Sequence, residues 1–432
     1  MYFKECLGIV GWDAIEPIVL IALAENAKIC FVGNHGASKT SVCHRLAMAL
    51  KKVEVKFQRY DCPNVKHDEI FGITNVKALT EGRYEFIQHP QTLWSKEVVL
   101  WSEINRTNPM LQSKLNEVLL EGTLHGSQTG VTWQFADANP SAKYEAYYLQ
   151  PQVAARLFFV SVPNPTSAMF RDMIANEGAF DVFADLPEYN DRDEAKKARS
   201  ERNAKIKKQV SPLNVFFHTT FLEEKVTEKD HKLAADVVDA AMRTMNEGSN
   251  GETFPLSMRE AKRMFKMVAR AGAYVRAAKM QPVGIMPIVE NIVLGHIPNF
   301  HGLLAHSYDH ASVIAAVRLV VTTHLEQNPQ AVMLGNGDPI NIITGMRRDG
   351  RFGAIERQHL RDVLVGRTHH DLIRYAAFAI AKTRKTPDTE KVVFLVLEEI
   401  VAAGMRLPAP QNTLWVPDNI NRYIATFREN NK

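Results

Sequence analysis

One short loop constrains this chain of 432 residues more than any other segment. A mostly apolar run over 27–32 precedes the loop, and a run that spaces Val42, Leu46 and Leu50 by four residues follows it. This order predicts a buried strand, a tight turn and a helix, which is the setting of a phosphate-binding loop. The residues predicted to contact phosphate are Gly33, Asn34, His35, Gly36, Ala37, Ser38, Lys39, Thr40 and Ser41.

Each part of this loop has a predicted task. Backbone N–H groups and the N-terminus of the following helix attract phosphate, and the Lys39 ammonium group reaches the β- and γ-phosphates. The Thr40 hydroxyl is the predicted ligand of Mg²⁺. Ser38 stands before the lysine, where glycine is expected, so a β-carbon must fit into a crowded turn. We therefore predict ATP and Mg²⁺ as cofactors, bound with slightly reduced affinity.

A further apolar strand is predicted over 96–103 and ends in Ser102 and Glu103. ATPases with a phosphate-binding loop need an aspartate for the metal and a carboxylate for the attacking water at such a strand end. Glu103 is the predicted catalytic base, and Ser102 is the predicted metal-site residue in place of the aspartate. Because a hydroxyl carries no charge, we expect a raised Mg²⁺ requirement and slow hydrolysis, and we expect Ser102→Asp to correct both.

Strands and helices alternate through the first part of the chain, which predicts a doubly wound α/β fold. Further strands are predicted over 53–63 and 156–165 and in a segment that ends near Asn139, where a hairpin leads into the strand. The run 391–401 fits either a strand or a helix. The predicted parts are an α/β nucleotide-binding core over 1–185, a charged linker or solvated helix over 186–210, a helical lid over 211–300 and a mostly helical region of unknown role over 301–432.

Several motifs in this order resemble the MoxR-type branch of the AAA+ ATPases. The motifs are GNHGASKT, WSEINR with the helix LQSKLNEVLLEG behind it, FADANP, ARLFF and SMREAKR. The resemblance extends over residues 8–290 and implies an AAA+ P-loop core with a parallel sheet, followed by a helical lid. It also implies an ATPase that assembles as a homo-oligomeric, hexameric ring and remodels or activates a protein partner, in a chaperone-like role. Such ATPases often act with a von Willebrand factor A-domain protein.

The resemblance further implies roles for four polar residues. Asn139 would be the sensor that orients the attacking water, and Arg156 would be the arginine finger offered to a neighbouring subunit's ATP. Arg259 would be the lid sensor that contacts phosphate, and Arg106 is a second candidate for contact across a subunit interface. The residues alone leave simpler alternatives open, because Asn139 precedes a proline and can cap a turn, and Arg156 can be a surface arginine.

Composition narrows the choice of partners. Lys and Arg number 52 against 48 Asp and Glu, and a net charge of +4 over this length does not by itself indicate a nucleic-acid or membrane partner. The basic run 205–208 keeps nucleic acid as a less favoured partner. The four cysteines show no CxxC spacing and are interpreted as core thiols of a cytoplasmic protein. Two other functions stay open: a nucleic-acid motor or loader, and an ATP-sensing assembly protein with little hydrolysis.

Overall fold

The computed structural model describes most of the first 326 residues and parts of the remainder. The described residues are 2–34, 38–83, 85–124, 127–139, 148–164, 166–167, 169, 171–172, 181–183, 192–247, 256–297, 303, 310–326, 360–361, 364, 375–376 and 387–404. The chain divides into two compact units, Met1–Met280 with Ile285–Thr322, and Gln281–Gly284 with Thr323–Lys432. The first unit contains the predicted nucleotide-binding core and nearly all of the predicted lid.

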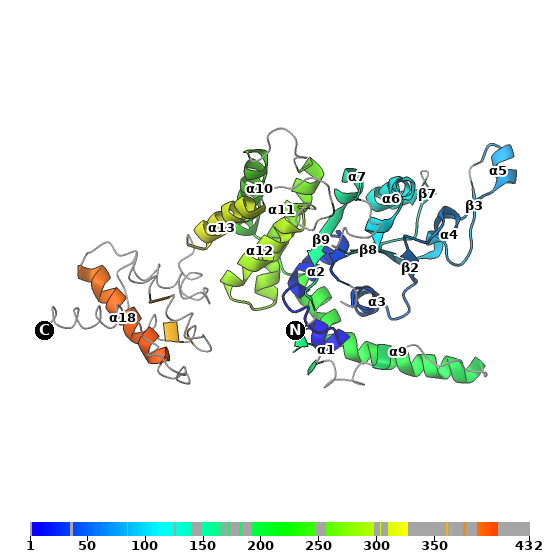
Figure 1. Cartoon of the computed structure of the whole chain (residues 1–432). Coiled ribbons are helices and arrows are strands. Elements are labelled where there is room, and N and C mark those ends of the chain that lie inside the picture. Colours follow the sequence, from blue (N-terminus) through cyan, green and yellow to red (C-terminus); the bar gives the residue numbers. More distant parts are fainter. Residues whose placement is uncertain are drawn as a thin grey trace. The chain divides into compact units, whose positions relative to one another are not determined.

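A five-stranded parallel sheet forms the centre of the first unit (Figure 1). Its strands lie in the order β2 (Phe57–Asp61), β5 (Val98–Ser102), β8 (Trp133–Ala138), β1 (Lys28–Val32) and β9 (Leu157–Ser161). All four strand pairings are parallel. The central strands are almost entirely buried, as expected for a parallel sheet covered on both faces. The predicted strands and the predicted α/β fold are confirmed.

Helices cover both faces of this sheet. α2 (Glu16–Ala24) packs against β1 and β9, and α3 (Lys39–Leu50) packs against β5 and β8. α6 (Pro109–Glu121) begins after an Asn108 cap whose side chain accepts a hydrogen bond from the Leu111 N–H. The apolar stripe predicted for this helix is buried, and it consists of Leu111, Leu115, Val118 and Leu119.

Short elements lie beside the main sheet. β3 (Ile73–Thr74) pairs antiparallel with β4 (Phe86–Ile87), and α5 (Val76–Thr80) lies between them in the chain. The other short elements are α1 (Tyr2–Leu7), α4 (His67–Phe71), α7 (Pro151–Ala154), β6 (Thr123–Leu124) and β7 (Ser127–Gln128). The antiparallel pair β6 and β7 is the hairpin expected before β8. The shortest helices were not predicted because so few residues show no helical period.

Long helices make up the rest of the first unit. The charge-rich segment expected to be a linker or a solvated helix lies largely in α9 (Arg192–Val215), and its Lys205, Lys207 and Lys208 side chains are exposed. A π-helical turn, Phe216–Phe221, follows α9 directly. The helices after it are α10 (Glu228–Glu247), α11 (Met258–Ala277), α12 (Ile285–Leu294) and α13 (His310–Glu326), of which residues 310–322 belong to this unit.

The described part of the second unit is helical. α18 (Pro387–Gly404) includes the run 391–401, so this run is a helix and not a strand. Glu399 on α18 is buried and accepts two hydrogen bonds from the Arg361 guanidinium, at 2.6 and 2.9 Å. The prediction of a mostly helical C-terminal region is therefore confirmed for the described residues.

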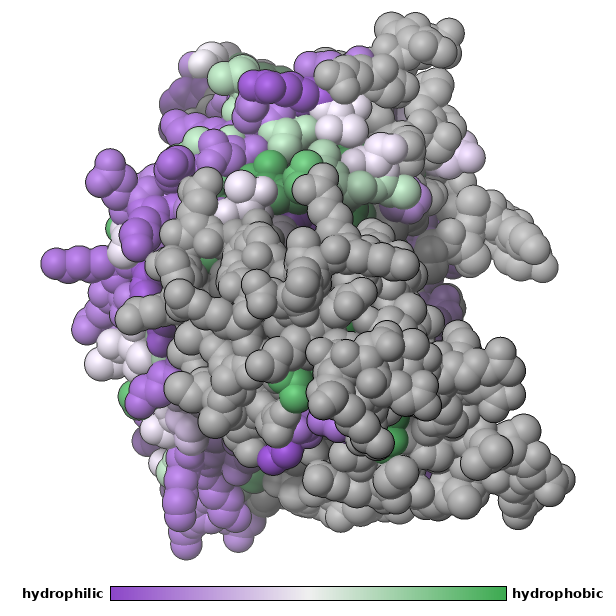
Figure 2. All heavy atoms as spheres, turned by 90° about the vertical axis from the view of Figure 1, so that its left-hand side faces the viewer, coloured by the Kyte–Doolittle hydropathy of each residue, from purple (hydrophilic) through white to green (hydrophobic). Residues whose placement is uncertain are grey.

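Polar residues gather on the surface and apolar residues in the core. On the face shown in Figure 2, the coloured residues along one side are mostly hydrophilic, and a small hydrophobic patch lies near the top. All four cysteines are buried, as expected for core thiols. Among the helices that the structure describes, none combines the length and apolar character needed to cross a membrane. The cytoplasmic location stays a prediction.

The lid helices contact the last strand of the sheet directly. The Phe159 N–H on β9 donates to the carbonyl of Gly295, the residue that follows α12, at 2.9 Å. A Cβ at position 295 would lie 2.6 Å from the Phe159 carbonyl oxygen and would overlap the Phe158 ring. Glycine at this position therefore lets the lid backbone approach the sheet backbone.

Gly295→Ala is expected to lower the free energy of unfolding by about 2 to 3 kcal/mol, because the added methyl group must displace backbone atoms of β9. Gly82→Ala is the matched control. Its φ of +76° gives left-handed strain of about 1 kcal/mol, and nothing lies within 4 Å of an added Cβ. Urea denaturation measures both variants, and equal losses of stability would contradict a tight contact between lid and sheet.

Candidate nucleotide site

Three parallel strand ends bring the predicted nucleotide residues together. β1 ends before Gly33, β5 ends at Ser102, and β8 ends at Ala138, next to Asn139. Because the strands are parallel, these ends share one edge of the sheet, and α/β proteins bind ligands at this edge. The Gly33 N–H donates to the Ala138 carbonyl at 3.2 Å, so the loop starts beside the end of β8.

The start of the loop is closely packed. A Cβ at Gly33 would lie 3.0 Å from the Val162 Cβ, which explains a glycine at this position. Asn34 donates from Nδ2 to the Asn164 side-chain oxygen at 2.9 Å. Ser38 is exposed and has a φ of 57°, a left-handed conformation that favours glycine and costs serine about 1 kcal/mol. The remaining predicted loop residues, His35, Gly36 and Ala37, lie outside the described residues.

The Lys39 ammonium group lies among oxygen atoms at this edge. Lys39 is the first residue of α3, and its side chain is buried. Its Nζ donates to the carbonyls of Gly33, Asn34 and Ala138, and to Asn139 Oδ1 at 3.0 Å. The lysine predicted to bind phosphate therefore lies at the junction of the loop and the end of β8.

Glu103 is held at the end of β5 by partners on two sides. Arg106 donates from Nη1 to Glu103 Oε2 at 2.9 Å, and Asn139 donates from Nδ2 to Glu103 Oε1 at 3.3 Å. Asn105 in turn donates from Nδ2 to the Asn139 carbonyl at 3.0 Å. Asn139 therefore contacts both Lys39 and Glu103, while Arg106 pairs with a carboxylate of its own chain.

The structure adds a buried carboxylate that the sequence reasoning missed. Asp137, near the end of β8, is only 4% exposed. Its Oδ2 accepts a hydrogen bond from Ser102 Oγ at 3.2 Å, and its Oδ1 accepts one from the Glu103 N–H at 2.9 Å. The signal in the sequence for this site is an acidic residue in a mostly apolar strand. Asp137 stands two positions before Asn139, so both side chains lie on the same face of the strand.

Oxygen atoms from four side chains converge on this edge, and Mg²⁺ prefers oxygen ligands. Half-buried Thr40 and buried Ser102 supply hydroxyls, and Glu103 and Asp137 supply carboxylates. Asn105 Oδ1 is buried without a hydrogen-bond partner in the described structure. In that same part of the chain, no group of three or more His, Cys, Asp or Glu residues could hold a metal ion. The residues therefore fit Mg²⁺ that shares its ligands with nucleotide phosphates.

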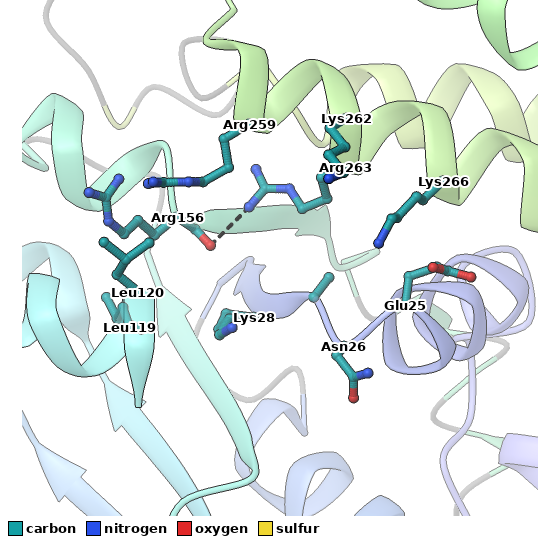
Figure 3. A pocket seen from close by; sticks show the side chains of 11 residues that line it. Glu25, Asn26, Lys28, Leu119, Leu120, Arg156, Arg259, Lys262, Arg263 and Lys266 are labelled. Carbon is teal, nitrogen blue, oxygen red and sulfur yellow. Dashed lines mark hydrogen bonds between the residues drawn. The ribbon is translucent and has the colours of Figure 1, made fainter. Parts of the chain in front are cut away.

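Arg156 and Arg259 lie together elsewhere, in a basic pocket of about 220 Å³ (Figure 3). Its cationic lining residues are Lys28, Arg156, Arg259, Lys262, Arg263 and Lys266. The acidic lining residue Glu25 is ion-paired with Arg270 at 2.8 Å. Burial lowers the pKa of Arg156, and the positive charge of Arg259 lowers it further. The pocket is therefore strongly electropositive.

The basic pocket and the phosphate-binding loop lie at opposite edges of the sheet. Lys28 begins β1 and Arg156 directly precedes β9, whereas Gly33 follows the end of β1. A five-residue strand spans roughly 13 Å, which is more than an arginine side chain can bridge. Arg156 therefore cannot reach a phosphate bound beside Lys39 of its own chain.

Two further residues that sequence reasoning missed connect the basic pocket to the lid. Arg263 on α11 donates to the carbonyls of Arg156 and Leu157 at 2.9 and 2.8 Å, and from Nε to His296 Nε2 at 3.1 Å. His296 Nδ1 lies 2.7 Å from the Ile292 carbonyl, so the ring is neutral with its proton on Nδ1. Burial lowers the pKa of Arg263 to about 10. Burial and the Arg263 charge hold the pKa of His296 well below its usual range.

Comparisons with known proteins agree with this arrangement. Residues 28–171 match the family model of the AAA domain, dynein-related subfamily. A 151-residue match to the uncharacterized protein YeaC of Bacillus subtilis (strain 168) is 30% identical and covers 33% of this chain and 44% of YeaC. The match to YeaC therefore spans less than half of that relative's length.

One solved structure is similar over a longer stretch. A crystal structure described as that of a "putative ATPase" from Cytophaga hutchinsonii has a TM-score of 0.40 and 16% identity, over 74% of this chain and 90% of that chain. The family-model match and the parallel sheet show an α/β AAA+ core followed by helical segments, as predicted.

Lowering the pH from about 7.5 to about 5.5 is expected to destabilise the first unit through His296. The folded chain keeps this imidazole neutral, whereas the unfolded chain protonates it near its ordinary pKa of 6.5. The unfolded state then binds more protons, so stability is full above that pKa and is lost below it, by about 1.4 kcal/mol for each pH unit.

Calorimetric melting of wild type and His296→Gln at several pH values measures this effect. Glutamine offers an oxygen acceptor and an N–H donor but does not titrate. The variant should therefore lose part of the pH dependence. The same slope in both proteins would show that His296 does not remain neutral in the folded state.

Proposed function

We propose that this chain binds ATP with Mg²⁺ and hydrolyses ATP as one subunit of a homo-oligomeric ring. The contact of Asn139 with both Lys39, at 3.0 Å, and Glu103, at 3.3 Å, carries this proposal. These contacts join a phosphate-binding lysine, a polar sensor and a candidate base at one edge of the sheet. The order of the motifs favours the MoxR type of AAA+ ATPase, with six subunits in the ring.

The residues at this edge can divide the chemistry of hydrolysis. Lys39 and the loop N–H groups would hold the β- and γ-phosphates, Thr40 would hold Mg²⁺ through its hydroxyl, and Asn139 would orient the attacking water. Glu103 accepts a proton as the water oxygen bonds to the γ-phosphorus and the bond to the β-phosphate oxygen breaks. When bound, Mg²⁺ neutralises phosphate charge. The hydrogen bonds to both Glu103 oxygens keep this base in place.

The separation of the two sites supports a ring. Arg156 is too far from Lys39 to act on its own nucleotide, and its Nε is buried without a hydrogen-bond partner in the described structure. The basic pocket fits an anionic group offered by another copy of the chain. In a ring, each subunit would therefore present Arg156 and Arg259 to the nucleotide of its neighbour.

Exposed apolar side chains support a protein partner. Figure 1 shows β3 and α5 projecting away from the main sheet within the first unit. Four large apolar side chains here are at least half exposed, namely Ile73, Val76, Leu79 and Ile87. Grouped exposed apolar residues mark protein interaction sites. A von Willebrand factor A-domain protein is the partner that we propose, and chaperone-like remodelling is the proposed outcome.

Lys39→Ala is expected to abolish ATP binding, because the loop loses the cation that contacts the β- and γ-phosphates. Lys77→Ala is the control, since Lys77 is exposed on α5 and its removal changes net charge equally. Calorimetric titration with ATP measures both variants, and circular dichroism checks that they fold. Equal ATP affinity in wild type and Lys39→Ala would contradict the assignment of the loop.

Arg156→Ala is expected to lower the ATPase rate by roughly 10³-fold, the lower end of the effect of an arginine finger in well-studied NTPases. Mixing Arg156→Ala subunits with Glu103→Gln subunits should restore part of the rate, because some interfaces then combine an intact Glu103 with an intact Arg156. Light scattering with ATP reports assembly. A protein that stays monomeric, or mixtures without any recovery, would argue against action across an interface.

A further inference from the structure

We propose that Asp137 supplies the carboxylate beside bound Mg²⁺ and ATP that β5 lacks at Ser102. This inference rests on the proposed ATPase function and assigns a metal-positioning residue to the neighbouring strand. Asp137 lies on β8, which separates β5 from β1 and its phosphate-binding loop. Burial raises the pKa of the Cys43 thiol on α3, and the negative charge of Asp137 raises this pKa further. This agrees with a carboxylate on the face of the sheet that α3 covers.

Two hydrogen bonds direct the Asp137 carboxylate to the end of β5. Oδ2 accepts from Ser102 Oγ at 3.2 Å, and Oδ1 accepts from the Glu103 N–H at 2.9 Å. The strand register pairs Trp101 with Ala136, so Ser102 and Asp137 are the next residues along two adjacent strands. The Asp137 carboxylate therefore lies beside the Ser102 side chain, close to where the carboxylate of an aspartate at position 102 would lie.

The charge of Asp137 is incompletely balanced within the described chain. Its carboxylate is 4% exposed and its two hydrogen-bond donors are neutral, and the described residues place no cation in an ion pair with it. Burying a carboxylate without a directly paired positive charge is costly. Burial lowers the pKa of Lys39, and the negative charge of Asp137 opposes this lowering. The Lys39 Nζ nevertheless donates its hydrogen bonds to other oxygens. A divalent cation near Thr40 would complete the balance.

Ser102 and Asp137 are complementary. A carboxylate at each position would place two buried negative charges within about the length of one hydrogen bond, and like charges at that distance disfavour each other. Serine instead donates a hydrogen bond to Asp137. Ser102→Asp alone therefore adds a second buried charge, and the gain in Mg²⁺ binding expected from it should be accompanied by a loss of stability. That single substitution should destabilise the Mg²⁺-free protein.

The test compares ATP binding with Mg²⁺ and with EDTA by calorimetry. Asp137→Asn removes the charge, keeps an oxygen to accept from the Glu103 N–H, and can donate from Nδ2 to the Ser102 hydroxyl in place of the bond that Asp137 accepts. Ser102→Ala removes one hydrogen bond while keeping the charge. In Asp137→Asn, the gain in ATP affinity caused by Mg²⁺ should be 10- to 100-fold smaller than in wild type. The ATP affinity measured in EDTA should stay the same. Ser102→Ala should keep most of the Mg²⁺ effect. The double variant Ser102→Asp with Asp137→Ala should regain it, because the carboxylate has moved back to β5.

The outcomes separate this inference from the proposed function. A wild type that binds no ATP would overturn both. A wild type that binds ATP with Mg²⁺, together with an Asp137→Asn variant of unchanged Mg²⁺ dependence, would overturn the role of Asp137 alone. If Asp137→Asn does not fold, the double variant decides, and a folded double variant without the Mg²⁺ effect would also overturn it.

Discussion

The insertion of β8 between β1 and β5 is the constraint on which the candidate site depends. In this strand order, the end of β8 lies beside both the phosphate-binding loop and the strand end that bears Glu103. Asn139 can therefore contact Lys39 on one side and Glu103 on the other. Asp137, on the same face of the strand, contacts Ser102 and the Glu103 backbone. One strand thus supplies the polar contacts that join two motifs far apart in the chain.

The parallel sheet also separates two polar regions of the first unit. Carboxylates, hydroxyls and Lys39 gather at the edge where the strands end, and the basic pocket lies at the edge where β1 and β9 begin. The lid contacts the sheet near the second edge. Arg263 donates to the carbonyls of Arg156 and Leu157 at the start of β9, and the Gly295 carbonyl accepts from the β9 backbone. The lid therefore contacts the basic pocket directly. In the proposed ring, a change in lid position would act on a neighbour's nucleotide.

Ser102 illustrates how a departure from a family pattern depends on its surroundings. Judged on β5 alone, the serine indicates a weakened metal site. Its hydroxyl in fact donates to Asp137, so a carboxylate is present at the same edge but on the adjacent strand. A buried site of this size accommodates one such charge more easily than two. The interpretation of this position changes once both strands are considered together.

The sequence by itself determined the elements whose signals are local: the strands, the amphipathic helices and the α/β AAA+ core. Strand burial, helical spacing and loop chemistry are properties of a few consecutive residues, so they can be read before folding. Only the tertiary structure decided that Asp137 meets Ser102, 35 residues away, and that Arg263 meets the carbonyl of Arg156, 107 residues away. It also decided that Arg156 and Arg259 share an edge opposite Lys39. These relations follow from strand order and lid docking, which depend on non-consecutive pairings that no short stretch of sequence encodes.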